Sequence, residues 1–143
     1  MKGINIFSGE KGLGGALTNP TVLARRKGCI AERYTVTFNG RSYSDVESAY
    51  HELKIGNPSV DDEMMVNLIA QKFQDHPTLQ DDVTQHGGSE FLAACSHFTN
   101  AKTPGSQSWE GQGIASRFIR NLILGYDRSL EGPAEHLGQV ALF

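Results

Sequence analysis

The most regular pattern of apolar and polar residues lies between residues 33 and 43. Residues 33–38 (Arg-Tyr-Thr-Val-Thr-Phe) alternate large apolar and polar side chains, which is typical of a β-strand with one buried face. Asn39-Gly40 follows, a pair that favours the type I′ turn of a hairpin, and residues 41–43 return as the second strand. The sequence therefore predicts an antiparallel β-hairpin here.

The chain then changes to a helical period, and we predict a helix from Tyr43 to Lys54. Residues three, four and seven positions apart share one face of a helix. One face of this helix is apolar and consists of Val46, Ala49 and Leu53. The other face carries a carboxylate, a phenol, an imidazole and an ammonium group, from Glu47, Tyr50, His51 and Lys54. Such groups on one rigid element suit acid–base or charge-stabilising chemistry.

Glu47 also has a purely structural interpretation. Ser44-x-x-Glu47 fits a capping box, in which the serine caps the helix and the glutamate returns to the N–H of the capping residue. The spacing alone leaves both roles open, a helix cap or a chemical group.

Apolar periodicity predicts two helices in the middle of the chain. The first is capped by Ser59 or Asp61, and its buried stripe consists of Met64, Met65, Leu68, Ile69 and Phe73. The second starts at residues 75–77 (Asp-His-Pro) and ends at Gly87-Gly88, which is a good C-terminal stop. Its buried side is expected to be Leu79 and Val83.

The last predicted helix has a strong amphipathic pattern. It opens at Gly113, and its apolar positions are Ile114, Phe118, Ile119, Leu122, Ile123 and Tyr126. Arg117 and Arg120 lie near its beginning. We assign residues 1–127 to one domain. We expect residues 128–143 to be a loosely attached tail or a contact in a homo-oligomer.

Two short apolar runs are predicted to be extended. Residues 4–7 (Ile-Asn-Ile-Phe) are rich in β-branched and aromatic side chains and form a strand candidate. Residues 91–95 (Phe-Leu-Ala-Ala-Cys) are predicted to be a buried strand. A long polar loop, residues 96–112, follows, and loops of this length inside a domain are often functional. Its Trp109, the only tryptophan, either stacks on a base or sugar or anchors the loop in the core.

Two segments near the N-terminus are candidates for anion binding. Residues 8–20 form a glycine-rich turn around Gly12, where backbone N–H groups can surround a phosphate. The turn matches no phosphate-loop pattern, and the alternative is an irregular surface loop that uses glycine for its backbone freedom. Arg25-Arg26-Lys27 is either a solvated face or an anion clamp.

These elements define the fold class as α+β, a mainly helical single domain with a small antiparallel sheet. The chain has 143 residues, 38% of them apolar and 20% charged, as in a globular domain. Its net charge of −3 gives no electrostatic case for nucleic acid or an anionic membrane. No apolar run approaches the roughly 18 residues of a membrane span, and no signal peptide is evident, so we expect a cytoplasmic protein.

Several kinds of chemistry have no motif in the chain. The two cysteines, Cys29 and Cys95, are too few for a disulfide framework. Neither C-x-x-C nor H-E-x-x-H nor G-x-S-x-G occurs, so we expect no metal site and no cofactor. The remaining carboxylates, cations, histidines and tryptophan suit a hydrolase of glycosidic or N-glycosidic bonds. They suit a non-catalytic nucleotide-binding module equally well.

Five motifs, in order from residue 4 to residue 126, resemble the NADAR/YbiA-like family. Residues 4–8 (INIFS) are similar to its opening motif, and residues 16–20 (ALTNP) to its early asparagine motif. Residues 34–54 resemble its hairpin and glutamate helix, and Lys72-Phe73 with Pro77 its next motif. Trp109 and the helix that follows resemble its final motif. The chain departs from the family pattern at Ser48, His51, Ala93 and Ser116.

The resemblance implies a function in the chemistry of ribosides. Such proteins cleave N-glycosidic bonds, either in a phosphoribosylamino-pyrimidine or between ADP-ribose and guanine. The expected partner is therefore a ribonucleotide or ADP-ribosyl small molecule, or ADP-ribosylated nucleic acid. By position, Glu47 matches the family's catalytic carboxylate, and Asn19 and Lys54 match its asparagine and its helix lysine. Trp109 matches the tryptophan expected to stack on the base.

The implied reaction assigns a role to each candidate group. Cleavage of a ribosyl C1′–N bond develops positive charge on the ribose, and Glu47 is placed to stabilise that charge or to activate water. The leaving nitrogen needs a proton, and Glu110, Asp45 or His51 could supply it. Candidates for substrate binding are Asn19, Tyr50, Lys54, Trp109, Arg117, Gly12 and Arg25. The alternative function is a module that binds or senses an ADP-ribose-like nucleotide without cleaving it.

Overall fold

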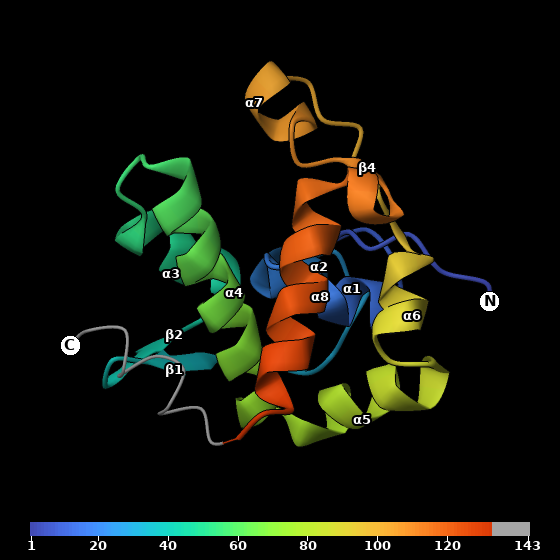
Figure 1. Ribbon diagram of the computed structural model, residues 1–143, viewed down its shortest axis with the longest axis horizontal. Helices are drawn as coiled ribbons and strands as arrows, with labels where there is room; N and C mark the ends of the chain where they lie inside the picture. The colour runs from blue at the N-terminus through green and yellow to red at the C-terminus, as the bar shows by residue number, and fades with distance from the viewer. Residues whose placement is uncertain (133–143) are drawn as a thin grey trace.

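Two long helices, α4 (Pro58–Asp75) and α8 (Arg117–Ser129), pack side by side at the centre of the fold (Figure 1). The computed structural model describes residues 1–132. Each helix contributes apolar side chains that are at most 3% exposed, among them Leu68, Phe73, Ile119 and Leu122. Gly125 of α8 lies against α4, and a Cβ atom there would come within 2.5 Å of Ile69 Cγ2. The glycine thus permits a close helix–helix approach.

The other elements surround this pair. The helices are α1 (Leu13–Leu17), α2 (Thr21–Arg26), α3 (Val46–Leu53), α5 (Pro77–His86), α6 (Ser89–Ala93) and α7 (Pro104–Gln107), with a 3₁₀ turn at Gly113–Ala115. The strands are β1 (Val36–Phe38), β2 (Arg41–Tyr43), β3 (Ser96–His97) and β4 (Gly111–Gln112). They form two antiparallel two-stranded sheets, β1–β2 and β3–β4. The predicted fold class, mainly helical α+β with a small antiparallel sheet, is confirmed.

The predicted β-hairpin is present with the predicted turn. Val36 pairs with Tyr43, and Phe38 pairs with Arg41. Both turn residues have positive φ, 52° at Asn39 and 77° at Gly40, as a type I′ turn requires. The hairpin lies against α4 and leads directly into α3, so it fixes where α3 begins.

Two predicted strands are largely absent. Residues 91–95 are not a strand, because Phe91 and Leu92 belong to α6, whose last turn is closed by the Ala94 N–H donating to the Glu90 carbonyl. Two adjacent apolar residues fit a short buried helix as well as a strand, and periodicity cannot separate them over five residues. Residues 4–7 make a single bridge, between Asn5 and Ser96, because the neighbouring strand β3 is only two residues long.

The glycine-rich segment is a packed helix and not a surface loop. Gly14 and Gly15 are buried in α1, and a Cβ atom on Gly15 would lie 2.4 Å from the Glu10 carbonyl oxygen. These glycines therefore allow close packing. Gly12 precedes the helix with φ 67°, the left-handed region that glycine adopts without strain.

Two helix starts also differ from the predictions. α4 is capped by Asn57, whose side chain accepts from the Val60 N–H, and not by Ser59 or Asp61. The last helix begins at Arg117 with Ser116 as its cap, since Gly113–Ala115 forms a separate 3₁₀ turn that leaves Ile114 67% exposed. The helix from Pro77 and its buried residues Leu79 and Val83 are as predicted.

The C-terminal helix crosses the boundary predicted at residue 127. α8 continues to Ser129, whose side chain is buried and whose carbonyl accepts a hydrogen bond from the Gln74 side chain. Residues 133–143, which contain most of the predicted tail, lie outside the described residues. Within residues 1–132, no helix combines the length and apolar character that crossing a bilayer requires.

Candidate functional site

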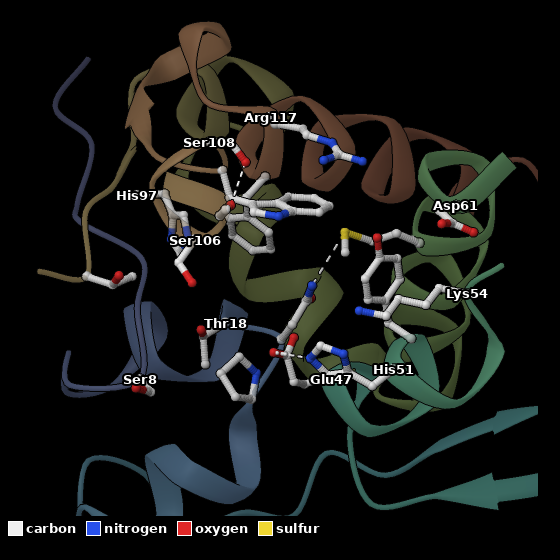
Figure 2. Close-up of a pocket in the computed structure, with 18 of the residues that line it drawn as sticks. Ser8, Thr18, Glu47, His51, Lys54, Asp61, His97, Ser106, Ser108 and Arg117 are labelled. Carbon is white, nitrogen blue, oxygen red and sulfur yellow. Dashed lines mark hydrogen bonds and ion pairs between the residues drawn. The ribbon is translucent and has the colours of Figure 1, made fainter. Parts of the chain in front are cut away.

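A cleft of about 900 Å³ opens beside the N-terminal end of α8. Its walls come from α3, from the connection between α1 and α2, from β3 and from the segment around α7 (Figure 2). Seven residues predicted to bind or react line this cleft together: Asn19, Glu47, Tyr50, His51, Lys54, Trp109 and Arg117. Folding thus brings residues that are almost 100 positions apart in sequence to one cavity.

The face of α3 that carries Glu47, His51 and Lys54 forms one wall of the cleft. It can do so because neither Ser44 nor Glu47 caps the helix. The cap is Asp45, whose carboxylate accepts from the Ser48 N–H at 2.8 Å and from the Val22 N–H at 3.0 Å. The capping box predicted from Ser44 and Glu47 is therefore wrong. Because Asp45 satisfies the helix end, the Glu47 carboxylate is free to face the cleft. It still lies in the first turn of the helix.

Glu47 and His51 form a pair at the mouth of the cleft. Glu47 Oε2 lies 3.1 Å from His51 Nε2, and the two side chains are 41% and 55% exposed. One turn further on, Lys54 Nζ lies 5.6 Å from the centre of the Tyr50 ring. Within residues 1–132 Lys54 has no carboxylate within 4 Å, so its charge is available to a ligand.

Asn19 lines the cleft, and its side chain contains a buried hydrogen-bond acceptor without a partner. The side chain is only 5% exposed, and its Oδ1 has no hydrogen-bond partner. Its Nδ2 donates weakly to Met65 Sδ at 3.5 Å, and its backbone carbonyl accepts from the N–H groups of Thr21 and Glu47. A buried acceptor left unpaired costs about 1–3 kcal/mol. A ligand that donates to Oδ1 recovers that free energy.

A buried lysine holds the segment that carries Asn19. Lys72 Nζ donates to the carbonyl oxygens of Ala16 at 2.6 Å and Thr18 at 2.8 Å. Burial lowers the pKa of Lys72 to about 7, and the nearby Asp45 carboxylate acts in the opposite direction. Lys72 was recognised in the sequence only as part of a motif, and its anchoring role depends on carbonyl groups more than 50 positions away.

Trp109 anchors its loop in the core, which is one of the two roles that the sequence left open, and it also lines the cleft. The Arg117 guanidinium carbon lies 3.8 Å from the ring centroid, and the Tyr50 ring meets the indole edge-on at 5.9 Å. Arg117 is held in place by Asp62, at 2.9 Å. Arg117 therefore already occupies the stacking position on one face of the tryptophan.

Three predicted residues are not among those that line the cleft. The Arg25 side chain turns back to the Ala31 carbonyl, and Gly12 serves as the start of α1. Glu110 accepts from the Thr99 N–H at 2.7 Å and from the Thr99 hydroxyl at 2.5 Å. These hydrogen bonds lower the pKa of Glu110 below its usual value. Glu110 thus holds together the two ends of the loop between β3 and β4. It is therefore not placed to act as a general acid in the cleft.

Among the cleft-lining residues that the sequence did not indicate are His97 and Ser8. His97 has no spacing relation to other candidates, and its place depends on the pairing of β3 with β4 and on contacts with residues 5 and 6. Ser8 accepts from Lys27 Nζ at 2.7 Å. Lys27 was noticed as a member of a basic cluster, and it is the member that lines the cleft.

The cleft can bind an anion and can stabilise a developing positive charge. Lys27, Lys54 and Arg117 supply cationic groups, and Glu47 supplies a carboxylate. Within residues 1–132 no group of three or more His, Cys, Asp or Glu side chains is arranged to hold a metal ion. No protein-family model, curated protein or solved structure matches the chain significantly.

Proposed function

We propose that this protein is an N-glycosidase that cleaves a ribosyl C1′–N bond in a phosphate-containing riboside. The proposal rests on one juxtaposition. The Glu47 carboxylate and the unpaired Asn19 Oδ1 line the same cleft, and the two residues are joined by a hydrogen bond from the Glu47 N–H to the Asn19 carbonyl, at 3.3 Å. A carboxylate beside a buried acceptor fits a sugar, which donates through its hydroxyls and becomes cationic in the transition state.

The proposed chemistry requires the Asn19 amide to turn toward the cleft, because its Oδ1 is buried in this structure. Glu47 stabilises the positive charge that develops on C1′ as the C–N bond breaks. Asn19 Oδ1 accepts from a ribose hydroxyl and thereby fixes the sugar. His51, 3.1 Å from Glu47, keeps the carboxylate oriented and is the donor nearest to it.

The charges of the cleft suit the rest of such a substrate. Lys54, Lys27 and Arg117 favour phosphate groups, and the exposed part of Trp109 favours a base. The substrate classes to test are an ADP-ribosylated guanine nucleic acid, a phosphoribosylamino-pyrimidine and NAD. The resemblance to the NADAR/YbiA-like family supports the same choice.

The test is incubation with each of these three substrates, followed by mass spectrometry for the released base. Glu47→Gln is expected to lower turnover by about 10²–10⁴-fold, because one well-placed charged group contributes about that much. Its matched control is Glu52→Gln, on the same helix. Glu52 binds Arg41 and Tyr43 and does not line the cleft, so the control should keep full turnover.

Three outcomes would decide against this proposal. Tight binding of ADP-ribose with no released base over hours would identify a nucleotide-binding module. The absence of any nucleotide-dependent shift in thermal unfolding would leave a structural role. Equal loss of activity per folded molecule in Glu47→Gln and Glu52→Gln would show that Glu47 has no specific part in the chemistry.

A further inference from the structure

His97 occupies a cleft position whose orientation is set by two contacts. Its Nδ1 lies 2.6 Å from the Ile6 carbonyl oxygen, and its ring packs on Phe118 with 4.6 Å between centroids. The backbone around it is also tied down, since Ser96 exchanges hydrogen bonds with Ile4 and Ile6. The ring therefore has little freedom to turn.

These contacts determine which nitrogen carries the proton. A carbonyl oxygen can only accept, so Nδ1 is the N–H donor to Ile6, and Nε2 of the neutral ring is an acceptor. Burial lowers the pKa of His97, while the Ile6 carbonyl and the carboxylates of Glu110 and Glu47 oppose that change. The ring is thus neutral at pH 7, and among residues 1–132 no hydrogen bond uses its Nε2.

His97 and Glu47 reach the cleft from different elements. His97 comes from β3 and Glu47 from α3, and Figure 2 shows Thr18 between them. The carboxylates facing this space are those of Glu47, Asp61 and, beyond Thr99, Glu110. The other charged or titratable groups of the cleft are Lys27, Lys54, Arg117 and the His51 ring. The neutral His97 ring thus lines the same cleft as the carboxylate that the proposed function places beside the sugar.

We propose that His97 is a catalytic base, which accepts a proton from the attacking water through Nε2. This inference rests on the proposed N-glycosidase function. In the step, a water O–H bond breaks and its proton moves to Nε2, while the water oxygen bonds to C1′. The C1′–N bond breaks, and its electron pair stays on the departing nitrogen. That nitrogen takes a proton from solvent, and the imidazolium returns its proton to solvent, so the net reaction consumes one water.

The geometry divides the work between two residues. Glu47 stabilises the ribosyl cation, and His97 takes up the proton of the attacking water. The positive charge that forms on His97 is stabilised by the Ile6 carbonyl and by the same two carboxylates, Glu47 and Glu110. A backbone carbonyl here orients the imidazole and fixes its tautomer.

The test is the pH dependence of kcat/KM for whichever riboside the protein cleaves, in wild type and in His97→Gln. Wild type should lose activity on the acid side with an apparent pKa below 6.5, as His97 becomes protonated. His97→Gln should lower kcat about 10²–10⁴-fold, leave KM within a few-fold and abolish that acid limb. Glutamine cannot titrate, which separates a base from a residue that only shapes the cleft.

The chain contains a matched control. His86 makes the same two kinds of contact, with Nδ1 at 2.7 Å from the Asp82 carbonyl and its ring 4.9 Å from Phe91, but it is exposed and does not line the cleft. His86→Gln should retain the wild-type kcat and the acid limb. If His97→Gln fails to fold, His97→Asn replaces it, because its shorter amide can keep the Ile6 contact while Nε2 is removed.

Each result has a definite meaning. The inference about His97 would be overturned if the wild type cleaves a substrate and His97→Gln keeps kcat within about threefold and retains the acid limb. The proposed function would then still stand. A wild type that cleaves none of the three substrates would overturn the proposed function and the inference with it. A large loss of ADP-ribose affinity in His97→Gln, with kcat unchanged, would make His97 a binding residue and not a base.

Discussion

The α4–α8 pair and the segment from β3 to β4 are stabilised by different kinds of contact. Between α4 and α8 the central contacts are apolar and buried, with Leu68, Ile69 and Ile119 at most 1% exposed, and ion pairs such as Arg117 with Asp62 lie beside them. In the segment between the strands, α7 contains no buried residue, and the turns are held by polar contacts such as Glu110 to Thr99. The first region supplies stability, and the second supplies part of a cleft wall.

The difference implies different responses to substitution. Burial of apolar area contributes roughly 25 cal/mol per Å², so substitutions in the buried contacts of the helix pair should cost much free energy of folding. Exposed polar contacts contribute little to global stability, and segments that rely on them open locally. Lys72 connects the two kinds of region. It belongs to the buried helix α4, and its side chain holds residues 16–18, which lead into the cleft wall.

The largest expected effect is on the helix pair. Phe73→Ala removes a side chain that is 1% exposed and packs edge-on against Tyr126 at 5.6 Å. We expect a loss of about 3–5 kcal/mol in the free energy of unfolding, measured by urea denaturation. Leu124→Ala, at a position that is 52% exposed on α8, is the control and should change it by about 0.5 kcal/mol or less. A loss below about 1 kcal/mol for Phe73→Ala would mean that this contact is not part of the core.

The second largest effect is the pH dependence that Lys72 gives to the free energy of unfolding. Its pKa is about 7 in the folded state and 10.5 without burial, so between these values the unfolded chain binds a proton that the folded chain releases. The free energy of unfolding should therefore rise with pH above 7, by at most about 1.4 kcal/mol per pH unit from this group.

The measurement is the slope of the free energy of unfolding against pH, between about pH 7.5 and pH 9.5, and this slope is compared between variants. Lys72→Met should lose the rise, while Lys11→Met, at an exposed lysine, should keep it. Equal slopes in wild type and Lys72→Met would mean that the buried amine does not release its proton in this range.

The smallest effect on global stability is expected in the segment between β3 and β4. Glu110→Gln weakens the contact with Thr99, so amide hydrogen exchange of residues 98–110 should speed up. The global free energy of unfolding should change by about 0.5 kcal/mol or less. Glu32→Gln, at an exposed glutamate, should leave exchange in this segment unchanged. A large global loss in Glu110→Gln would contradict the division between the two regions.

Much of the secondary structure was predictable because it depends on local signals. Asn39-Gly40 determines its turn through backbone preferences, and the periodic stripe of α4 appears in the sequence as it does in the fold. The same holds for one wall of the cleft, since the spacing of Glu47, His51 and Lys54 on one helix already places them together.

Other features were not predictable because the deciding contacts are distant in sequence. Asp45 became the cap of α3 while also binding the Val22 N–H of α2, a contact that no local rule contains. Gly12 and Arg25 looked like phosphate ligands by composition, yet packing uses them elsewhere. α6 was misread because five apolar residues carry too short a period to distinguish helix from strand.

The sequence by itself determined the helical content, the hairpin and the reactive face of α3, because each follows from the preferences of neighbouring residues. Only the tertiary structure decided that Asn19 Oδ1 is buried without a partner, that Arg117 covers one face of Trp109 and that His97 joins the cleft. The burial of Asn19, the stacking of Arg117 and the tautomer of His97 all depend on contacts between segments that are distant in sequence. These contacts exist only after α3, β3 and the start of α8 have come together in the folded chain.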